Sequence, residues 1–269
     1  MSESAARKTC PETYVRLAER LAVRARETVL PYFRAPLDVE RKPDNSPVTA
    51  ADREVEAALR ALIAEACPDH GIIGEEFAAE RPEADYIWVL DPIDGTKRFI
   101  AGHAQFGTLI ALLCAGQPIL GVIEMPALEE RWIGAAGHPT VHRDRRGTRQ
   151  ARVRPCAEPG EAVLYATSPH MFPGEDFTAF ERVRSRVKQP LYGGECYAYG
   201  LLASGFVDLV VESTMDVYDF MALVPVVRGA GGVMTGWRGA ALDLHADGRV
   251  IAAGDPRCHA AAIDLLCRG

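Results

Sequence analysis

Long apolar runs are absent from this chain. The longest, such as Leu109 to Ala115, are far shorter than the roughly 20 apolar residues of a membrane-spanning helix. The first thirty residues mix Arg, Glu and Lys throughout, so they lack the apolar segment of a secretory signal. We therefore expect no membrane partner and a cytoplasmic location.

Cysteine pairs with metal-binding spacing are also absent. The cysteines number seven, which is odd, and no two of them form a C-x-x-C pair. This pattern argues against a zinc site and against a disulfide framework, and it favours reduced thiols in a cytoplasm.

The chain has no excess of basic charge. It carries 30 Lys and Arg residues against 37 Asp and Glu residues, for a formal net charge of −7. Proteins that bind nucleic acid non-specifically are usually basic, so we expect no nucleic-acid partner. The excess of acid alone says little, because most surface carboxylates serve solubility. What matters is whether some of them converge.

The overall fractions of hydrophobic and charged residues are ordinary for a globular protein. The 269 residues are 48% hydrophobic and 25% charged, without a visible repeat or low-complexity segment. This length suits one large domain or two closely packed lobes with a sizeable core.

Helical and strand-like patterns alternate along the chain. Apolar residues at helical spacing predict helices from Pro11 to about Tyr32 and from Thr49 to about Ala66. Short apolar runs bounded by Gly and Pro predict strands, and the second half alternates between the two patterns. The predicted strands are 86–90, 107–114, 119–124, 131–135, 163–166, 206–211 and 249–253, and the later helices are 176–187, 195–203, 219–229 and 256–266. This order indicates an α/β (α+β) sandwich.

Three acidic clusters follow strand-like runs or stand at helix starts. Glu75 and Glu76 follow a short apolar run, Asp91 and Asp94 follow another, and Asp219 opens a helical run. Three or four converging carboxylates with no matching His or Cys suit Mg²⁺ better than zinc. Without a cation such crowding is costly, because each carboxylate raises the pKa of its neighbours.

Asp91 and Asp94 belong to the sequence Asp-Pro-Ile-Asp-Gly-Thr at the end of an apolar strand. Successive side chains of a strand point to opposite faces, so we expect Pro92 to stop the strand and let both carboxylates face one point. Thr96 follows Gly95 at an expected helix start, where free backbone N–H groups bind phosphate. One loop would thus supply both metal ligands and phosphate donors.

Each acidic residue also has a purely structural interpretation. Asp-Pro and Asp-Gly are common turn dipeptides, and paired glutamates are typical of solvated loops. Asp219 is placed to cap a helix, and Asp52 follows Thr49 by three residues as in a capping box. Glu212 ends an apolar strand, as a surface residue can. The functional interpretation therefore rests on the combination.

In combination, these motifs resemble the inositol-monophosphatase superfamily of metal-dependent, lithium-sensitive phosphatases. The shared pattern is an early Asp, a Glu-Glu pair, Asp-Pro-Ile-Asp-Gly-Thr, and a Trp-Asp pair separated by eleven residues from Gly-Gly. In this chain it reads Asp52, Glu75-Glu76, Asp91 to Thr96, Asp219 and Gly231-Gly232. The resemblance covers about residues 12–267 and implies a five-layered α-β-α-β-α sandwich with its site between the lobes, assembled as a homodimer.

The resemblance also implies a metal centre of two or three Mg²⁺ ions. Glu75, Asp91 and the backbone carbonyl of Ile93 would hold one ion. Asp91, Asp94 and Asp219 would hold a second, and a third, weaker ion would lie near Glu75.

The same resemblance assigns catalytic and substrate-binding roles. Thr96 and Asp52 would orient and deprotonate the attacking water, with Glu75 as the third catalytic residue. Gly95 and Thr96 would donate backbone N–H groups to the phosphate. Glu212 matches a position that contacts the substrate's polar group.

One departure from the superfamily pattern is Tyr218, where the usual residue is Trp. The surroundings of Tyr218 and the stretch Gly193 to Tyr199 look like the histidinol-phosphate phosphatase branch. Histidinol phosphate carries an ammonium and an imidazole, so Glu195 and Glu212 would pair with a cation. Tyr197, Tyr199 or Tyr218 would flank the imidazole, with helix packing as the alternative for Tyr197 and Tyr199.

Two lobes are predicted from the composition. The stretch from Arg143 to Gly160 is polar and rich in Arg, Pro and Gly, which is typical of a boundary. We place an N-terminal α+β lobe with most metal ligands at residues 1–145. A C-terminal α/β lobe with Asp219 and the specificity residues would occupy residues 146–269.

We therefore predict a Mg²⁺-dependent phosphomonoesterase that hydrolyses L-histidinol phosphate by direct in-line attack of water, a step of histidine biosynthesis. The metal motif does not separate this substrate from inositol 1-phosphate, a sugar bisphosphate or a nucleotide phosphate. An alternative of another class is a regulatory protein of this fold that acts through partners such as the transcription machinery. The intact metal ligands argue against that alternative.

Overall fold

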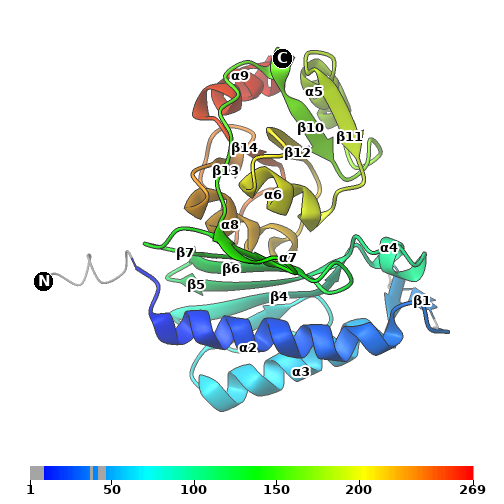
Figure 1. The fold of residues 1–269 in the computed structure, drawn as a ribbon, viewed down its shortest axis with the longest axis vertical. Coiled ribbons are helices and arrows are strands. Elements are labelled where there is room, and N and C mark those ends of the chain that lie inside the picture. Colours follow the sequence, from blue (N-terminus) through cyan, green and yellow to red (C-terminus); the bar gives the residue numbers. More distant parts are fainter. Residues whose placement is uncertain (1–8, 37–38, 42–46, 269) are drawn as a thin grey trace, which may run out of the picture.

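The computed structural model describes residues 9–36, 39–41 and 47–268. In these ranges two large β-sheets alternate with layers of helices. The N-terminal helices form the layer at one end of the molecule, and the C-terminal helix lies in the layer at the other end (Figure 1). The five-layered α-β-α-β-α sandwich predicted from the sequence is confirmed.

The first layer consists of two helices that lie side by side against one sheet, α2 (Glu12–Val29) and α3 (Ala50–Ala66) (Figure 1). Helix α3 begins with a capping box. The Thr49 side chain accepts a hydrogen bond from the backbone of the first turn, and the Asp52 side chain accepts one from the backbone N–H of Thr49. Both helices bury one apolar stripe, which is what their helical spacing predicts. The stripe of α2 contains Leu17, Ala18, Leu21, Ala22, Ala25 and Val29.

The second layer is a seven-stranded sheet in the order β3-β4-β5-β6-β7-β8-β9. Strands β3 and β4 are parallel, and every later neighbour is antiparallel. The strands are β3 (Gly71–Gly74), β4 (Tyr86–Asp94), β5 (Gly107–Cys114), β6 (Gln117–Met125), β7 (Glu130–Ala135), β8 (Val141–Asp144) and β9 (Gly147–Gln150).

The middle layer packs unusually close to this sheet. Helices α6 (Cys196–Ala203), α7 (Val217–Phe220) and α8 (Leu223–Gly229) lie between the two sheets (Figure 1). A Cβ atom on Gly121 would lie 1.9 Å from the carbonyl oxygen of Ala222, so only glycine permits this approach.

The fourth and fifth layers belong to the C-terminal part. The five-stranded sheet has the order β11-β10-β12-β14-β13, with β10 parallel to both neighbours and the other pairs antiparallel. Helices α5 (Glu175–Arg184) and α9 (Pro256–Cys267) cover its outer face. The strands are β10 (Val163–Ala166), β11 (Gln189–Tyr192), β12 (Leu209–Glu212), β13 (Val233–Gly236) and β14 (Val250–Ala253).

Short elements complete the described chain. The strands β1 (Val39–Arg41) and β2 (Pro47–Thr49) form a small antiparallel pair, and α4 (Thr96–Ile100) follows β4. Two 3₁₀ turns, Leu30–Tyr32 and Pro159–Glu161, lie in connections.

Three hydrophobic cores correspond to the contacts between layers. One lies between α2, α3 and the large sheet, one between the two sheets around α6, α7 and α8, and one between the smaller sheet and α5 and α9. The middle core joins both sheets, so the elements that enter it from each side are held in fixed relation.

Two predicted elements differ from the structure. Pro92 does not stop its strand, because β4 runs through it to Asp94. The predicted helix 219–229 is two helices, and Asp219 is the third residue of the short helix α7 rather than the residue that opens a long one.

The proposed division of the chain at residues 145 and 146 falls in the turn between β8 and β9, and both strands belong to the large sheet. Residues 1–8, 37–38, 42–46 and 269 of the two predicted lobes lie outside the described residues. The lobe boundaries stay a prediction.

Two sequence expectations concern location. All seven cysteines are free thiols. In the described ranges, every helix is too short or too polar to cross a membrane.

Candidate active site

Asp91 and Asp94 lie where the pairing of β4 with β5 is irregular. Asp91 pairs with Leu109 and Asp94 pairs with Gly107, so three steps along β4 match two steps along β5. Residues three apart in a regular strand point to opposite faces, and the one extra residue of this bulge compensates for that reversal. A bulge at Pro92, and not the end of the strand, therefore brings the two carboxylates together.

Asp91 is the centre of an acidic cluster. Its side chain is buried, and burial followed by the charges of Glu75, Asp94 and Asp219 raises its pKa well above the usual range. Burial and the charges of Asp94 and Glu75 likewise raise the pKa of Asp219. Such effects fall off with distance, so the structure brings together these four predicted metal ligands from three segments of the chain.

Backbone groups hold two of these carboxylates. Asp94 Oδ2 accepts a hydrogen bond of 2.7 Å from the backbone N–H of Cys196, at the start of α6. Asp219 Oδ2 accepts one of 2.7 Å from the N–H of Asp216, as part of the capping box of α7. Asp91 Oδ1 is buried and has no hydrogen-bond partner among the described residues.

The donor set fits a hard divalent cation. All the converging ligands are oxygens, and the buried Asp91 Oδ1 is an acceptor without a donor. As they stand, however, no three His, Cys, Asp or Glu side chains of the described ranges form a group ready to hold a metal ion. One oxygen each of Asp94 and Asp219 is bonded to a backbone N–H group. The ligand assignment itself stays a prediction.

Thr96 connects this cluster to helix α3. Its hydroxyl lies 3.0 Å from the carbonyl oxygen of Ile93 and 3.5 Å from Asp52 Oδ1, and its single hydrogen can go to either acceptor. The other oxygen of Asp52 accepts from the backbone N–H and the hydroxyl of Thr49, at 2.8 and 2.6 Å. Asp52 thus caps its helix and faces Thr96, while its catalytic role stays a prediction.

Gly95 forms the turn between β4 and α4. It has a φ of 82°, in the left-handed region that favours glycine. Thr96 is therefore the first residue of α4, where helix geometry leaves backbone N–H groups without helical acceptors. This arrangement is the one predicted for phosphate binding, though its role stays a prediction.

Glu195 forms the opposite wall of the cluster and has an unusual backbone. Its φ of 44° and ψ of −146° lie in a sparsely populated region for a residue with a side chain. This conformation leads into α6 and points the N–H of the next residue, Cys196, at Asp94.

The Glu195 carboxylate already has a cationic neighbour. Arg98 Nε on α4 lies 2.5 Å from Glu195 Oε2. Burial raises the pKa of Glu195 to about 7, while the Arg98 guanidinium lowers it and the charge of Asp94 raises it. The predicted contact of Glu195 with a substrate cation would therefore compete with Arg98.

Glu212 and Tyr218 are held by protein groups. The two Glu212 oxygens accept from the backbone N–H of Thr167 at 2.9 Å and from the Tyr199 hydroxyl at 2.8 Å. Burial raises the pKa of Glu212. The Tyr218 hydroxyl donates to Asp216 Oδ2 at 2.9 Å.

Sequence reasoning missed three charged residues beside this site, namely Arg98, Glu56 and Arg60. Arg98 had no signal, because its partner Glu195 is distant in the sequence. Glu56 and Arg60 did have one, since they follow Asp52 at intervals of four residues and so share its helix face.

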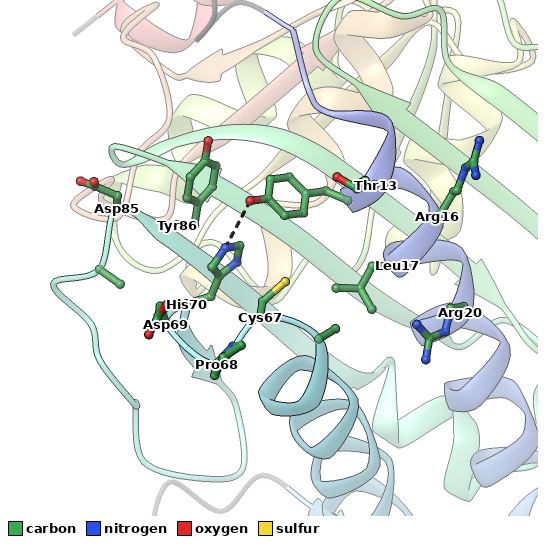
Figure 2. Close-up of a pocket in the computed structure, with 13 residues that line it drawn as sticks. Thr13, Arg16, Leu17, Arg20, Cys67, Pro68, Asp69, His70, Asp85 and Tyr86 are labelled. Carbon is green, nitrogen blue, oxygen red and sulfur yellow. Dashed lines mark hydrogen bonds between the residues drawn. The ribbon is translucent and has the colours of Figure 1, made fainter.

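A cavity of about 760 Å³ lies away from the acidic cluster, between the N-terminal half of α2 and the start of β4 (Figure 2). Tyr86 lines it at the first residue of β4, about 16 Å along the strand from Asp91. His70 is its central polar group, and its ring accepts from Trp88 Nε1 at 3.1 Å and contacts the Tyr14 hydroxyl at 3.4 Å. These groups satisfy one another, so the cavity adds nothing to the site.

The fold and the site define a class of protein. The fold is a five-layered sandwich, and its buried carboxylates beside a helix-start loop form a donor set that suits a hard divalent cation. Comparison with known proteins agrees, since the model of the inositol monophosphatase family matches residues 11–268. The chain belongs to the inositol monophosphatase family, whose enzymes are metal-dependent phosphatases.

Three relatives illustrate the range of this similarity. The bifunctional phosphatase IMPL2, chloroplastic, of Arabidopsis thaliana is 47% identical over 95% of this chain and 75% of its own length. A histidinol-phosphatase of Mycobacterium tuberculosis is 38% identical over 84% of this chain and 88% of its own length. A solved inositol monophosphatase from Zymomonas mobilis is 45% identical, with a TM-score of 0.86 over 95% of this chain and 98% of that one.

Proposed function

We propose that this chain is a Mg²⁺-dependent phosphomonoesterase that hydrolyses L-histidinol phosphate to L-histidinol and phosphate, within histidine biosynthesis. The observation that carries the metal dependence is Asp91, a buried carboxylate with three acidic neighbours and one oxygen without a partner among the described residues. The similarity to a histidinol-phosphatase supports the substrate.

Five groups would hold the cations. Glu75, Asp91 and the Ile93 carbonyl would bind one Mg²⁺, and Asp91, Asp94 and Asp219 a second, with a weaker third ion near Glu75. When bound, these ions lower the pKa of a water molecule and neutralise charge on the phosphoryl oxygens and the leaving alkoxide.

The protein's own side chains would then handle the proton. Thr96 would accept a hydrogen bond from the attacking water and donate its own hydrogen to Asp52 Oδ1, which lies 3.5 Å away. Asp52 is fixed for this role, because Thr49 holds its other oxygen with two hydrogen bonds. Gly95 and Thr96 would donate backbone N–H groups to the phosphate, and Glu75 would help position the water.

The acidic wall beside the metal ligands favours a cationic leaving group. The charge of Asp94 acts on both Glu195 and Glu212, so these two carboxylates lie near the metal ligands. An ammonium or imidazolium of the substrate would lie closer to compensating charge here than a ring of hydroxyl groups would. Tyr218 would flank the imidazole.

The direct test is phosphate release from histidinol phosphate and from inositol 1-phosphate, with Mg²⁺ and with EDTA. We expect a preference for histidinol phosphate of at least about tenfold in kcat/KM, and no release in EDTA. Glu195→Gln should raise KM for histidinol phosphate and leave KM for p-nitrophenyl phosphate, which has no cationic group, nearly unchanged. Equal effects on both substrates would contradict the specificity role of Glu195.

A second candidate substrate is inositol 1-phosphate or another small phosphomonoester. The similarity to the Zymomonas mobilis inositol monophosphatase favours it. A reversed preference in the same assay would replace histidinol phosphate by inositol phosphate. Lithium inhibition, a homodimer and a cytoplasmic location remain predictions that enzyme assays, sedimentation and cell fractionation would check.

A further inference from the structure

Glu56 lies on helix α3, and its fully buried carboxylate contacts the loop that carries Glu75. Its Oε2 accepts a hydrogen bond of 2.7 Å from the backbone N–H of Glu76, and its Oε1 accepts one of 3.3 Å from the N–H of Phe77. A negatively charged acceptor makes such bonds stronger than neutral ones. The loop is thus tied through its backbone to the core of the first layer.

Arg60 completes this anchor one helical turn further on. Its Nε donates to Glu56 Oε1 at 2.8 Å, so the buried carboxylate has a buried counter-charge. Its other nitrogens bind Glu80 Oε1 at 2.9 Å and the carbonyl oxygen of Phe77 at 3.1 Å. The guanidinium also lies over the Phe77 ring, 5.7 Å from its centroid, which is within the reach of about 6 Å for a cation–π contact.

The loop lies against the carboxylate without space to spare. A Cβ atom on Gly74 would lie 2.0 Å from Glu56 Oε1, so glycine is required for this approach. On its other side, the backbone N–H of Glu75 donates to the carbonyl of Leu90 at 3.2 Å, next to Asp91. Glu75 is therefore fixed between Glu56 and the strand that bears the other acids.

This anchor opposes the electrostatic repulsion between the carboxylates of Glu75 and Asp91. The Glu75 backbone is bonded to Leu90, the residue before Asp91, so the two carboxylates come from neighbouring positions of adjacent segments. Like charges in a partly buried place repel, and a loop is the element that yields most easily. Holding the loop by its backbone opposes that displacement and keeps Glu75 beside Asp91.

We propose that Glu56, supported by Arg60, is a positioning residue that holds the 74–77 loop so that Glu75 meets Asp91 in the metal centre. This inference rests on the proposed metal-dependent function. Glu56 touches backbone N–H groups and not the reacting atoms, so its effect is on Mg²⁺ affinity more than on the chemical step.

The test compares Glu56→Gln with Glu65→Gln, the same change at an exposed position of the same helix. An amide cannot serve two backbone N–H groups and Arg60 as a carboxylate does. Three quantities are measured on the full chain: hydrogen exchange of the amides of residues 76 and 77 in EDTA, the rise in Tm on adding Mg²⁺, and the Mg²⁺ concentration for half-maximal activity.

For Glu56→Gln we expect faster exchange at residues 76 and 77 and about a 10–100-fold higher Mg²⁺ requirement in both the Tm and the activity titrations. Activity at saturating Mg²⁺ should largely recover, and Glu65→Gln should match the unmodified chain. Arg60→Lys keeps the charge but loses the planar fork, so it should raise the Mg²⁺ requirement by a smaller factor. That variant also serves if Glu56→Gln fails to fold.

Faster exchange with an unchanged Mg²⁺ requirement would overturn the proposal, because Glu56 would then stabilise the loop without positioning a ligand. Unchanged exchange would overturn it too. A chain that binds Mg²⁺ but does not hydrolyse histidinol phosphate would count only against the proposed substrate. The Tm titration reports Mg²⁺ binding without any substrate. Absence of any Mg²⁺ effect on the unmodified chain would overturn the metal centre and this proposal together.

Discussion

Two buried carboxylates of the large sheet lie in opposite electrostatic surroundings. Glu124 on β6 is 0% exposed and is enclosed by the guanidinium groups of Arg26, at 2.5 Å, and Arg131. Asp91 on β4 is 2% exposed, and the charges that raise its pKa are those of other acids. Removing one partner from a carboxylate buried with its counter-charges destabilises the fold, whereas a carboxylate buried among like charges marks a place for a cation.

The largest effect should come from neutralising Asp91. Asp91→Asn keeps the shape of the side chain but removes the carboxylate shared by both proposed ions. We expect kcat/KM to fall by about 10³-fold or more, with the circular dichroism spectrum unchanged. Near-normal activity in Mg²⁺ would refute the ligand assignment.

The same kind of change at Glu124 should affect stability and not catalysis. Glu124→Gln leaves the buried Arg131 without its counter-charge, and breaking a buried ion pair costs about 3–5 kcal/mol. Urea unfolding should show this loss, while kcat at a temperature where the variant is folded should stay close to that of the unmodified chain. A stable variant with low activity would contradict the comparison.

The pH dependence of stability should report the crowding of carboxylates around Asp91. In EDTA the pKa of Asp91 in the folded chain lies above its unfolded value. Its contribution to stability is full below the unfolded value, near pH 4, and is lost as pH rises through the folded value. Asp91→Asn should therefore lose less stability than the unmodified chain as the pH rises above about 4. Chemical unfolding in EDTA at several pH values measures this difference, and parallel curves would contradict it.

The smallest effect should come from one of the two arginines on Glu124. Arg26 is partly exposed, and Arg131 still faces Glu124 after Arg26→Gln. Because water screens an exposed partner, we expect a loss of about 1 kcal/mol in urea unfolding and no change in activity. A loss as large as that of Glu124→Gln would mean that Arg131 alone cannot balance the carboxylate.

The elements with regular apolar spacing were predictable from the sequence. Helices α2 and α3 and strand β5 match their predicted ranges closely, because each buries a stripe or run that nothing interrupts. The five layers came from the family resemblance of spaced motifs, since apolar spacing alone does not order the strands of a sheet.

The finer features of the site were beyond sequence reasoning. The bulge at Pro92 depends on how β4 pairs with β5, and a one-residue slip between strands leaves no local pattern. The break between α7 and α8 lies inside an apolar run that a single helix would bury equally well. The pair of Arg98 and Glu195 joins segments that meet only through the middle layer.

The most direct measurement is an anomalous diffraction map of crystals soaked in Mn²⁺, which replaces Mg²⁺ at oxygen sites and scatters anomalously. The account predicts peaks at coordination distance, about 2.0–2.2 Å, from carboxylate oxygens of Asp91, with Glu75, Asp94 and Asp219 drawn in around them. A map with no peak at Asp91, or with its peaks at other acids, would contradict it.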